Sequence, residues 1–176
     1  MKPLLAALIS ALLLAGCGGD GDSAASGDGG VDRAFVADMV PHHESAVEMA
    51  EIAQQRGESP FVRKLAADII RTQQAEIATL RSEDEALAST GVKPGSLGVP
   101  AHMMGMDDDP AALRTADPFD RAFIEMMIPH HEGAIEMAKA EIAKGSDPEL
   151  KSLAQQIIDA QQREIDQMRA EVEKLG

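Results

Sequence analysis

Apolar and polar positions along most of this chain follow the spacing of amphipathic helices. Between residues 32 and 56, apolar side chains recur every three or four positions and form two adjacent stripes on a helix of about 3.6 residues per turn. Similar spacing returns at 60–88, 118–144 and 148–175. No stretch has the pattern of a convincing strand. The sequence therefore predicts an all-α protein with four long helices.

Capping residues set the expected ends of these helices. Ser59-Pro60, Asp117-Pro118 and Asp147-Pro148 each place a capping side chain before a proline that suits the first helical position. Gly57 and Gly145 stand where the first and third helices should stop. The four helices therefore form two helical hairpins.

The two hairpins are copies of one another. Residues 32–50 align without a gap with residues 120–138, and thirteen of these nineteen positions are identical. The match continues as far as residues 81 and 169. We therefore predict a four-helix bundle made of two duplicated hairpins, 31–88 and 118–175, joined by a methionine-rich loop at 89–117.

Each copy carries a Pro-His-His sequence inside its first helix, at residues 41–43 and 129–131. An internal proline removes a backbone hydrogen bond and clashes with the preceding turn, so we expect a kink or break before each histidine pair. Helical spacing places both histidines of each pair on the apolar face. The candidate metal ligands on this face are His42, His43, Met39, Met49, His130, His131, Met127 and Met137.

The second helix of each hairpin offers polar partners at the same level. If the first hairpin turns near residue 58, its histidine pair lies level with residues 74 and 75. Gln73 and Glu76 interrupt the apolar stripe there, and Gln161 and Glu164 repeat them. Buried polar groups need partners, and carboxylates commonly orient histidine ligands. We predict that these four residues support the histidines.

The glutamates of the motif project away from the apolar face. As pairs four residues apart they are expected to repel each other. This orientation and the absence of a Glu-x-x-His sequence make a di-iron or di-manganese carboxylate site the second choice. These outward residues are Glu44, Glu48, Glu132 and Glu136.

The ligand types favour copper. Imidazole suits copper, zinc, iron or nickel, and a thioether beside it shifts the preference towards Cu(I). The loop adds His102, Met103, Met104 and Met106 as further candidate ligands. We predict a protein that sequesters or transfers Cu(I), without a predicted enzyme activity. An iron, manganese or zinc enzyme with a histidine/carboxylate centre stays open, as does a metal-free interaction module.

The first residues are similar to a bacterial lipoprotein signal. Lys2 precedes an apolar run, and Leu14-Ala15-Gly16-Cys17 forms a small-residue cleavage pattern. We expect residues 1–16 to be a signal peptide, Cys17 to be lipidated and residues 17–30 to include a flexible Gly/Ser-rich tether. The domain, 31–176, would then be anchored by lipid to the cell membrane, outside the cytoplasm.

Composition narrows the partners. The chain has 16 Lys and Arg against 30 Asp and Glu, with no Trp or Tyr. This acidity and the lack of stacking side chains argue against nucleic acid. Cys17 is the single cysteine, so neither an intrachain disulfide nor a thiolate metal site is expected. The expected partners are a metal ion and the membrane; the sequence identifies no protein partner.

The two Met-x-Pro-His-His-Glu-x-Ala-x-Glu-Met-Ala motifs resemble the domain-of-unknown-function family 305. Its members are secreted or membrane-anchored bacterial proteins with a ferritin-like helical bundle, and the resemblance covers about residues 31–175. It implies a four-helix bundle, and copper binding and tolerance outside the cytoplasm for some relatives. Transferred by motif position, it implies the same eight methionines and histidines as ligands.

Overall fold

The helices begin and end close to their predicted capping residues. The computed structural model describes residues 29–107 and 109–175. Within them lie α1 (Gly30–Arg56), α2 (Pro60–Ser89), α3 (Phe119–Lys144), α4 (Pro148–Leu175), two short 3-10 helices, η1 (Ala101–Met103) and η2 (Pro110–Arg114), and no strand. The prediction of an all-α four-helix bundle is confirmed. The predicted signal peptide, Cys17 and all but the last two residues of the predicted tether lie outside the described residues.

Two of the predicted helix caps are present and one is wrong. The Ser59 hydroxyl accepts a hydrogen bond from the Val62 N–H at 3.1 Å, and Asp147 accepts from the Leu150 N–H at 3.0 Å. By contrast, Pro118 has an extended backbone, so α3 begins one residue later than predicted and lacks a side-chain cap at its start. At the other end of the bundle, α1 begins at Gly30, within the predicted tether.

The internal prolines do not break their helices. Both α1 and α3 continue without interruption through Pro41 and Pro129. Each helix packs against its hairpin partner and against the other, and such tertiary packing stabilises a helix more than its local propensity does. The predicted break is therefore wrong, whereas a bend at these prolines stays a prediction.

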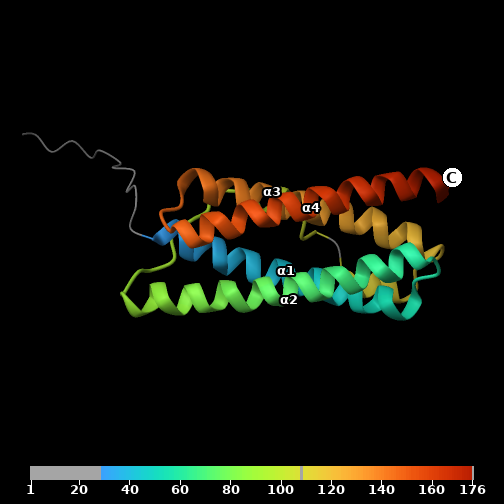
Figure 1. Ribbon diagram of the computed structural model, residues 1–176, viewed down its shortest axis with the longest axis horizontal. Helices are drawn as coiled ribbons and strands as arrows, with labels where there is room; N and C mark the ends of the chain where they lie inside the picture. Colours follow the sequence, from blue (N-terminus) through green and yellow to red (C-terminus); the bar gives the residue numbers. More distant parts are fainter. Residues whose placement is uncertain (1–28, 108, 176) are drawn as a thin grey trace, which may run out of the picture.

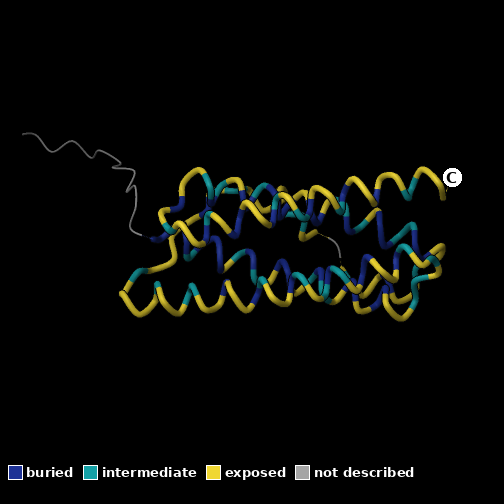
Figure 2. The backbone as a smooth tube through the Cα atoms, viewed as in Figure 1, coloured by how far each residue is buried: buried dark blue, intermediate teal, exposed yellow. Residues whose placement is uncertain are grey.

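The two hairpins pack against each other through their first helices. Figure 1 shows α1 and α2, coloured blue to green, below α3 and α4, coloured orange to red. The helix α1 packs along α2 and against α3, and α3 packs along α4. Figure 2 shows that the buried residues lie between the helices while exposed residues cover the outside. Among the described residues, no helix combines the length and apolar character needed to cross a membrane.

A reciprocal pair of buried carboxylates fixes the hairpins relative to each other. Asp32, at the start of α1, accepts hydrogen bonds from the N–H groups of Ser146 and Asp147 at 2.8 and 2.7 Å. Asp120, at the start of α3, accepts from the N–H groups of residues 58 and 59 at 2.8 and 2.7 Å. Each first helix therefore begins beside the turn of the other hairpin, which makes α1 and α3 antiparallel.

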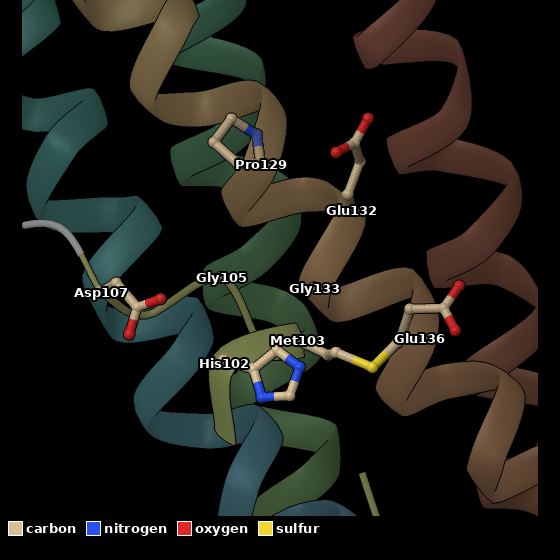
Figure 3. Close-up of a pocket in the computed structure, with 8 residues that line it drawn as sticks. All are labelled: His102, Met103, Gly105, Asp107, Pro129, Glu132, Gly133 and Glu136. Atoms are coloured by element: carbon tan, nitrogen blue, oxygen red, sulfur yellow. The ribbon is translucent and has the colours of Figure 1, made fainter. Parts of the chain in front are cut away.

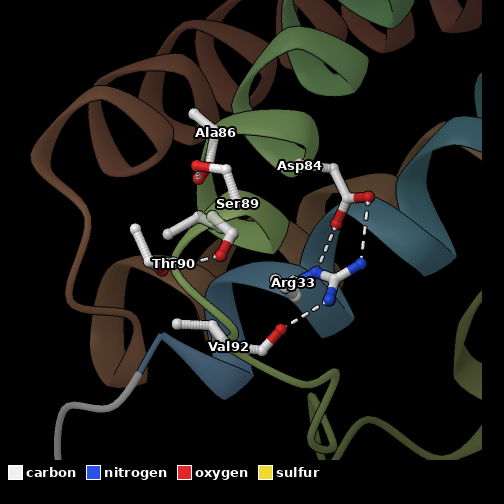
Figure 4. A network of polar contacts seen from close by, with 7 residues as sticks. Arg33, Asp84, Ala86, Ser89, Thr90 and Val92 are labelled. Carbon is white, nitrogen blue, oxygen red and sulfur yellow. Dashed lines mark hydrogen bonds and ion pairs between the residues drawn. The ribbon is translucent and has the colours of Figure 1, made fainter.

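The start of α1 is also tied to the end of α2. The Arg33 guanidinium donates to both carboxylate oxygens of Asp84, at 2.7 and 3.2 Å, and to the Val92 carbonyl at 2.5 Å. Figure 4 shows this bidentate pair and the bond to the first residues after α2. The equivalent Arg121 instead pairs with Glu125 in its own helix. The Arg33 contacts therefore anchor the beginning of the interhairpin loop.

A polar layer divides the apolar core into two clusters. The first contains Met49, Val62, Phe119, Phe123, Met127, Ile165 and Met168 among others. The second contains Phe35, Met39, Leu80, Met137, Leu150 and Ile157 among others. In each helix a histidine pair or a Gln/Glu pair lies between the segments that enter the two clusters. The histidine motif therefore occupies the middle of the bundle.

One buried carboxyl group breaks the repeat. Glu141 is fully buried on α3, where the first hairpin has Ala53. Burial, and then the neighbouring Asp32 carboxylate, raise the pKa of Glu141 to about 8. Burial opposes ionisation of Asp32 as well, but hydrogen bonds from residues 146 and 147 outweigh it and hold the Asp32 pKa below its usual value. Glu141 is therefore protonated at neutral pH, beside an ionised Asp32.

This environment predicts a pH-dependent stability difference between the protein and its Glu141→Gln variant. The folded-state pKa of Glu141, about 8, exceeds the value of 4.5 for an ordinary glutamate. The folded state thus holds a proton that the unfolded state has lost, and the contribution of Glu141 to stability falls as pH rises from 4.5 to 8. The slope is at most about 1.4 kcal/mol per pH unit.

Urea unfolding at a series of pH values measures this difference. Because glutamine does not titrate, the free energy of unfolding of the variant should rise relative to that of the parent between pH 5 and pH 8. The exposed Glu149→Gln change is the matched control for the loss of one carboxyl group. A Glu141→Gln difference that stays constant across this range would mean that the carboxyl group is ionised in the folded protein.

Candidate metal centre

The histidines of the two repeats meet where α1 crosses α3. The imidazole rings of His42 and His130 have centroids 3.8 Å apart and planes tilted by 38°. The His43 ring lies 6.2 Å from that of His42. All four side chains are buried, with no residue more than 3 % exposed. The antiparallel register set by Asp32 and Asp120 therefore brings both motifs into one histidine cluster, His42, His43, His130 and His131.

Carboxylates from the second helices hold the outer histidine of each pair. The His43 Nε2 atom lies 2.9 Å from Glu76 Oε2, and the His131 Nε2 atom lies 2.7 Å from Glu164 Oε2. Both glutamates therefore lie level with the histidines. Each carboxylate orients one imidazole and leaves its Nδ1 atom facing the protein interior.

The two predicted amide partners lie in the histidine layer, but, unlike the glutamates, they show no hydrogen bond to a histidine in the described part of the chain. Gln73 and Gln161 are buried in the same layer of the bundle. Among the described residues, neither side-chain oxygen has a hydrogen-bond partner. These glutamines add polar groups to the layer without satisfying the histidines.

The histidine cluster contains six buried nitrogen atoms without hydrogen-bond partners among the described residues. They are both ring nitrogens of His42, both of His130, and the Nδ1 atoms of His43 and His131. A buried polar group without a partner destabilises a fold by about 1–3 kcal/mol. So many in one place is unusual in a folded protein. A metal ion is one kind of partner that imidazole nitrogens take.

Burial keeps the inner imidazoles neutral. Desolvation, followed by repulsion from neighbouring imidazoles, lowers the pKa of His42 to about 3. The same causes lower the pKa of His130 well below its usual value. A neutral imidazole keeps one nitrogen lone pair available for coordination. At neutral pH these side chains are therefore in the protonation state that a metal requires.

Thioether groups flank the histidine cluster. The four motif methionines are at most 1 % exposed. Met39 and Met137 belong to one apolar cluster, whereas Met49 and Met127 belong to the other. Among the described residues, no group of three His, Cys, Asp or Glu side chains could hold a metal ion. The four thioether groups thus belong to the apolar clusters on the two sides of the histidine layer.

The outward glutamates form ion pairs rather than a second site. Glu44 pairs with Arg81 and Glu132 pairs with Arg169, at equivalent positions of the two hairpins. Glu48 pairs with Arg114, and Glu136 with Lys139. Their exposure confirms that they project outward. Each of these glutamates therefore has a basic residue beside it, which offsets the repulsion expected between glutamates four residues apart.

Part of the loop crosses the outside of the centre. We call residues 101–106 the strap. Its Met104 packs against the cluster that holds Met39 and Met137, whereas Met103 and Met106 are each 43 % exposed and His102 is also exposed. His102 and Met103 line a pocket of about 270 Å³ together with Glu132, Glu136 and others (Figure 3). The structure thus places Met104 inward and the other three candidate loop ligands at the surface.

Sequence reasoning missed three elements of this region. The inter-hairpin role of Asp32 and Asp120 could have been suspected from their repetition at equivalent helix starts. Glu141 could have been noticed because it replaces an alanine seven residues after Ala134 on a buried face. One sequence feature could have indicated the position of the strap: the second repeat has Gly133 where the first repeat has Ser45.

Known proteins are similar to this chain in sequence and fold. The family model described as Domain of unknown function (DUF305) matches residues 32–172. The structure of "CopM in the Cu(I)-bound form" is 38 % identical, with a TM-score of 0.70 and coverage of 82 % of this chain and 96 % of that one. CopM structures in Cu(II)-bound, Ag-bound and apo forms match similarly.

Two further matches come from named organisms. A DUF305 fragment from Deinococcus radiodurans is 31 % identical, with a TM-score of 0.68 and coverage of 82 % of this chain and 96 % of that one. Uncharacterized protein L153 of Acanthamoeba polyphaga mimivirus is 45 % identical over 49 residues, which are 28 % of this chain. The match spans 32 % of the length of that viral protein.

The unpartnered imidazoles predict that the metal-free protein is more stable without them. Replacing His42 and His130 together by leucine removes four unsatisfied nitrogens and keeps apolar bulk. The free energy of unfolding, measured with urea in the presence of a chelator, should rise by at least about 1 kcal/mol.

The matched control is His102→Leu, the same change at an exposed position, which should shift stability by less than about 0.5 kcal/mol. If the double variant is instead less stable than the parent in the metal-free state, the buried imidazoles make favourable contacts in the folded protein and the centre is structural.

Proposed function

The chain belongs to the DUF305 family, and from this premise we propose that it binds copper as Cu(I) through the histidine cluster and the flanking methionines. Binding serves to sequester copper or to transfer it, with no covalent chemistry. The observation that carries the proposal is the set of six unpartnered, buried ring nitrogens at the crossing of α1 and α3.

The ligand chemistry favours the cuprous ion. Imidazole and thioether are neutral donors, and Cu(I) is the soft first-row ion that accepts both. A monovalent ion also requires less compensation than a divalent one when it leaves water for a buried site. The carboxylates of Glu76 and Glu164 contact His43 and His131 and so place negative charge next to the histidine cluster without binding the metal themselves.

The two flanking methionine pairs suggest where sulfur ligands enter. Met39 and Met137 approach from one apolar cluster and Met49 and Met127 from the other. Such exchangeable thioether ligands suit a protein that releases its copper again. The similarity to CopM, solved with Cu(I), Cu(II) and Ag, supports a copper ligand for this chain as well.

A di-iron or di-manganese carboxylate centre fits these residues less well. Such centres use several inward glutamates, whereas both inward carboxylates of this layer bond a histidine. The motif glutamates lie outside the bundle in ion pairs. The residues present therefore match copper better than a carboxylate-bridged pair of metals.

We place the protein outside the cytoplasm, attached to the membrane through a lipid on Cys17. The support is the signal-like sequence of the first 17 residues. In cell fractionation, a Cys17→Ser variant should leave the membrane fraction. If it stays with the membrane as the parent does, lipid on Cys17 is not the anchor.

Copper titration tests the proposed function directly. The chain from residue 17, carrying Cys17→Ser, should bind Cu(I) in competition with a chromogenic Cu(I) chelator. His42→Ala/His130→Ala should weaken binding by at least about tenfold, which corresponds to about 1.4 kcal/mol for the loss of two ligands.

The matched control removes two motif glutamates that face solvent, Glu44→Gln/Glu132→Gln, and should leave Cu(I) affinity unchanged. Iron, manganese and zinc are titrated in parallel. Tight binding of one of these metals with no response to copper would contradict the proposal and support the di-metal alternative. Failure of all four metals to bind would support a metal-free interaction module.

A further inference from the structure

The strap lies directly on the helix that carries the second histidine pair. A Cβ atom added to Gly133 would lie 2.1 Å from the Met104 carbonyl oxygen. A Cβ atom on Gly105 would lie 2.4 Å from the Pro129 carbonyl oxygen and 2.9 Å from the His130 Cα atom. The backbones of the strap and of α3 are therefore in contact, as the close-up shows (Figure 3). Two glycines permit this approach.

The strap also reaches the first histidine pair. The backbone of Met104 is a neighbour of the His42 ring. The Met104 side chain packs on the apolar cluster beside Met39 and Met137. One segment of backbone therefore covers both inner histidines and touches the methionine side of the centre.

The strap is anchored by the residues before and after it, whereas the strap itself makes few backbone hydrogen bonds. Upstream, Leu97 is buried and its carbonyl accepts a hydrogen bond from Lys144 Nζ at 2.9 Å. Downstream, Leu113 is buried and its carbonyl accepts from Arg56 at 2.5 Å. The strap itself shows, among the described residues, the backbone bonds Met103 N–H to Pro100 O and Met104 N–H to Ala101 O, which are local.

This distribution of contacts allows the strap to move without unfolding the bundle. Segments with few buried contacts and few backbone bonds to the core open at lower free energy than the core itself. Gly98 and Gly105 have φ of 71° and 69°, a left-handed conformation that glycine adopts without strain. The anchors at Leu97 and Leu113 would keep a displaced strap near its site.

We propose that the strap is the gate of the buried histidine cluster: it must swing away from α3 before a metal ion can reach or leave His42 and His130. The gating role rests on the proposed function of the cluster as a copper site. The outward His102, Met103 and Met106 lie on the same segment and are accessible to an arriving ion. Opening of the strap, rather than diffusion, then limits the rate of metal exchange.

Accessibility of the histidines tests the gate without any metal. Diethyl pyrocarbonate acylates accessible imidazole nitrogens, and peptide mass spectrometry follows each histidine of the chain from residue 17 carrying Cys17→Ser. The exposed His102 is an internal reference. In the parent, His42 and His130 should react far more slowly than His102.

Gly133→Ala should open the gate. The new Cβ atom cannot coexist with the Met104 carbonyl at 2.1 Å, so the strap must shift. Labelling of His42 and His130 should accelerate by at least about tenfold, a change that corresponds to about 1.4 kcal/mol in the opening equilibrium. Ser45→Ala, at the equivalent position of the first repeat, is the matched control and should leave the rates unchanged.

A second pair of variants leaves the helices intact. Met104→Ala removes the inward side chain of the strap and should also accelerate labelling of His42 and His130. Met103→Ala changes an outward side chain of the same strap and should not. This pair decides the question if Gly133→Ala fails to fold.

The order of labelling separates gating from unfolding. Opening of the strap should expose His42 and His130 ahead of His43 and His131, whereas global unfolding exposes all four together. Unchanged labelling in Met104→Ala and in folded Gly133→Ala, or equal acceleration of all four histidines, would overturn the gate.

Stopped-flow mixing with Cu(I) completes the test, and Gly133→Ala should increase the rate of copper uptake in parallel with labelling. If labelling follows the prediction but the parent binds no copper, the proposed function fails while the strap still controls access. If copper binds and labelling does not respond, the gate alone fails.

Discussion

The main constraint on this structure is the burial of four imidazoles at the crossing of two helices. Burial and mutual repulsion keep His42 and His130 uncharged, and six ring nitrogens have no hydrogen-bond partner among the described residues. Apolar residues at these positions would give a more stable bundle. Because these nitrogen atoms have no hydrogen bonds to lose in the metal-free protein, a metal ion that binds them stabilises the folded protein more. This imbalance connects the packing of the bundle with the proposed copper binding.

The relative register of the two hairpins brings the four histidines together. Asp32 and Asp120 each hold the turn of the opposite hairpin, so α1 and α3 cross antiparallel and their Pro-His-His sequences meet. Duplication supplies two equivalent halves, and the differences between them are informative. Gly133 replaces Ser45 where the strap lies on α3, and Glu141 replaces Ala53 beside Asp32. The two histidine motifs are equivalent by sequence, but the loop covers the histidine cluster on the α3 side only.

Patterns within each hairpin could be predicted from the sequence, and contacts between hairpins could not. Helical spacing and capping residues located the four helices, and antiparallel counting placed Glu76 level with His43, because both depend on local geometry. The pairing of His42 with His130, the role of Asp32 and the path of the strap depend on how two separate hairpins dock. Prolines 41 and 129 were expected to kink or break their helices, and packing on two sides keeps the helices unbroken.

We propose that copper occupies the layer between α1 and α3 and binds the inner imidazoles. Anomalous scattering at the copper edge, from crystals of the Cu(I)-loaded protein, measures this directly. We expect a copper peak within coordination distance of a ring nitrogen of His42 or His130 and of at least one motif methionine sulfur. Copper found on the outer surface at His102 and Met103, with the histidine cluster unchanged, would contradict it.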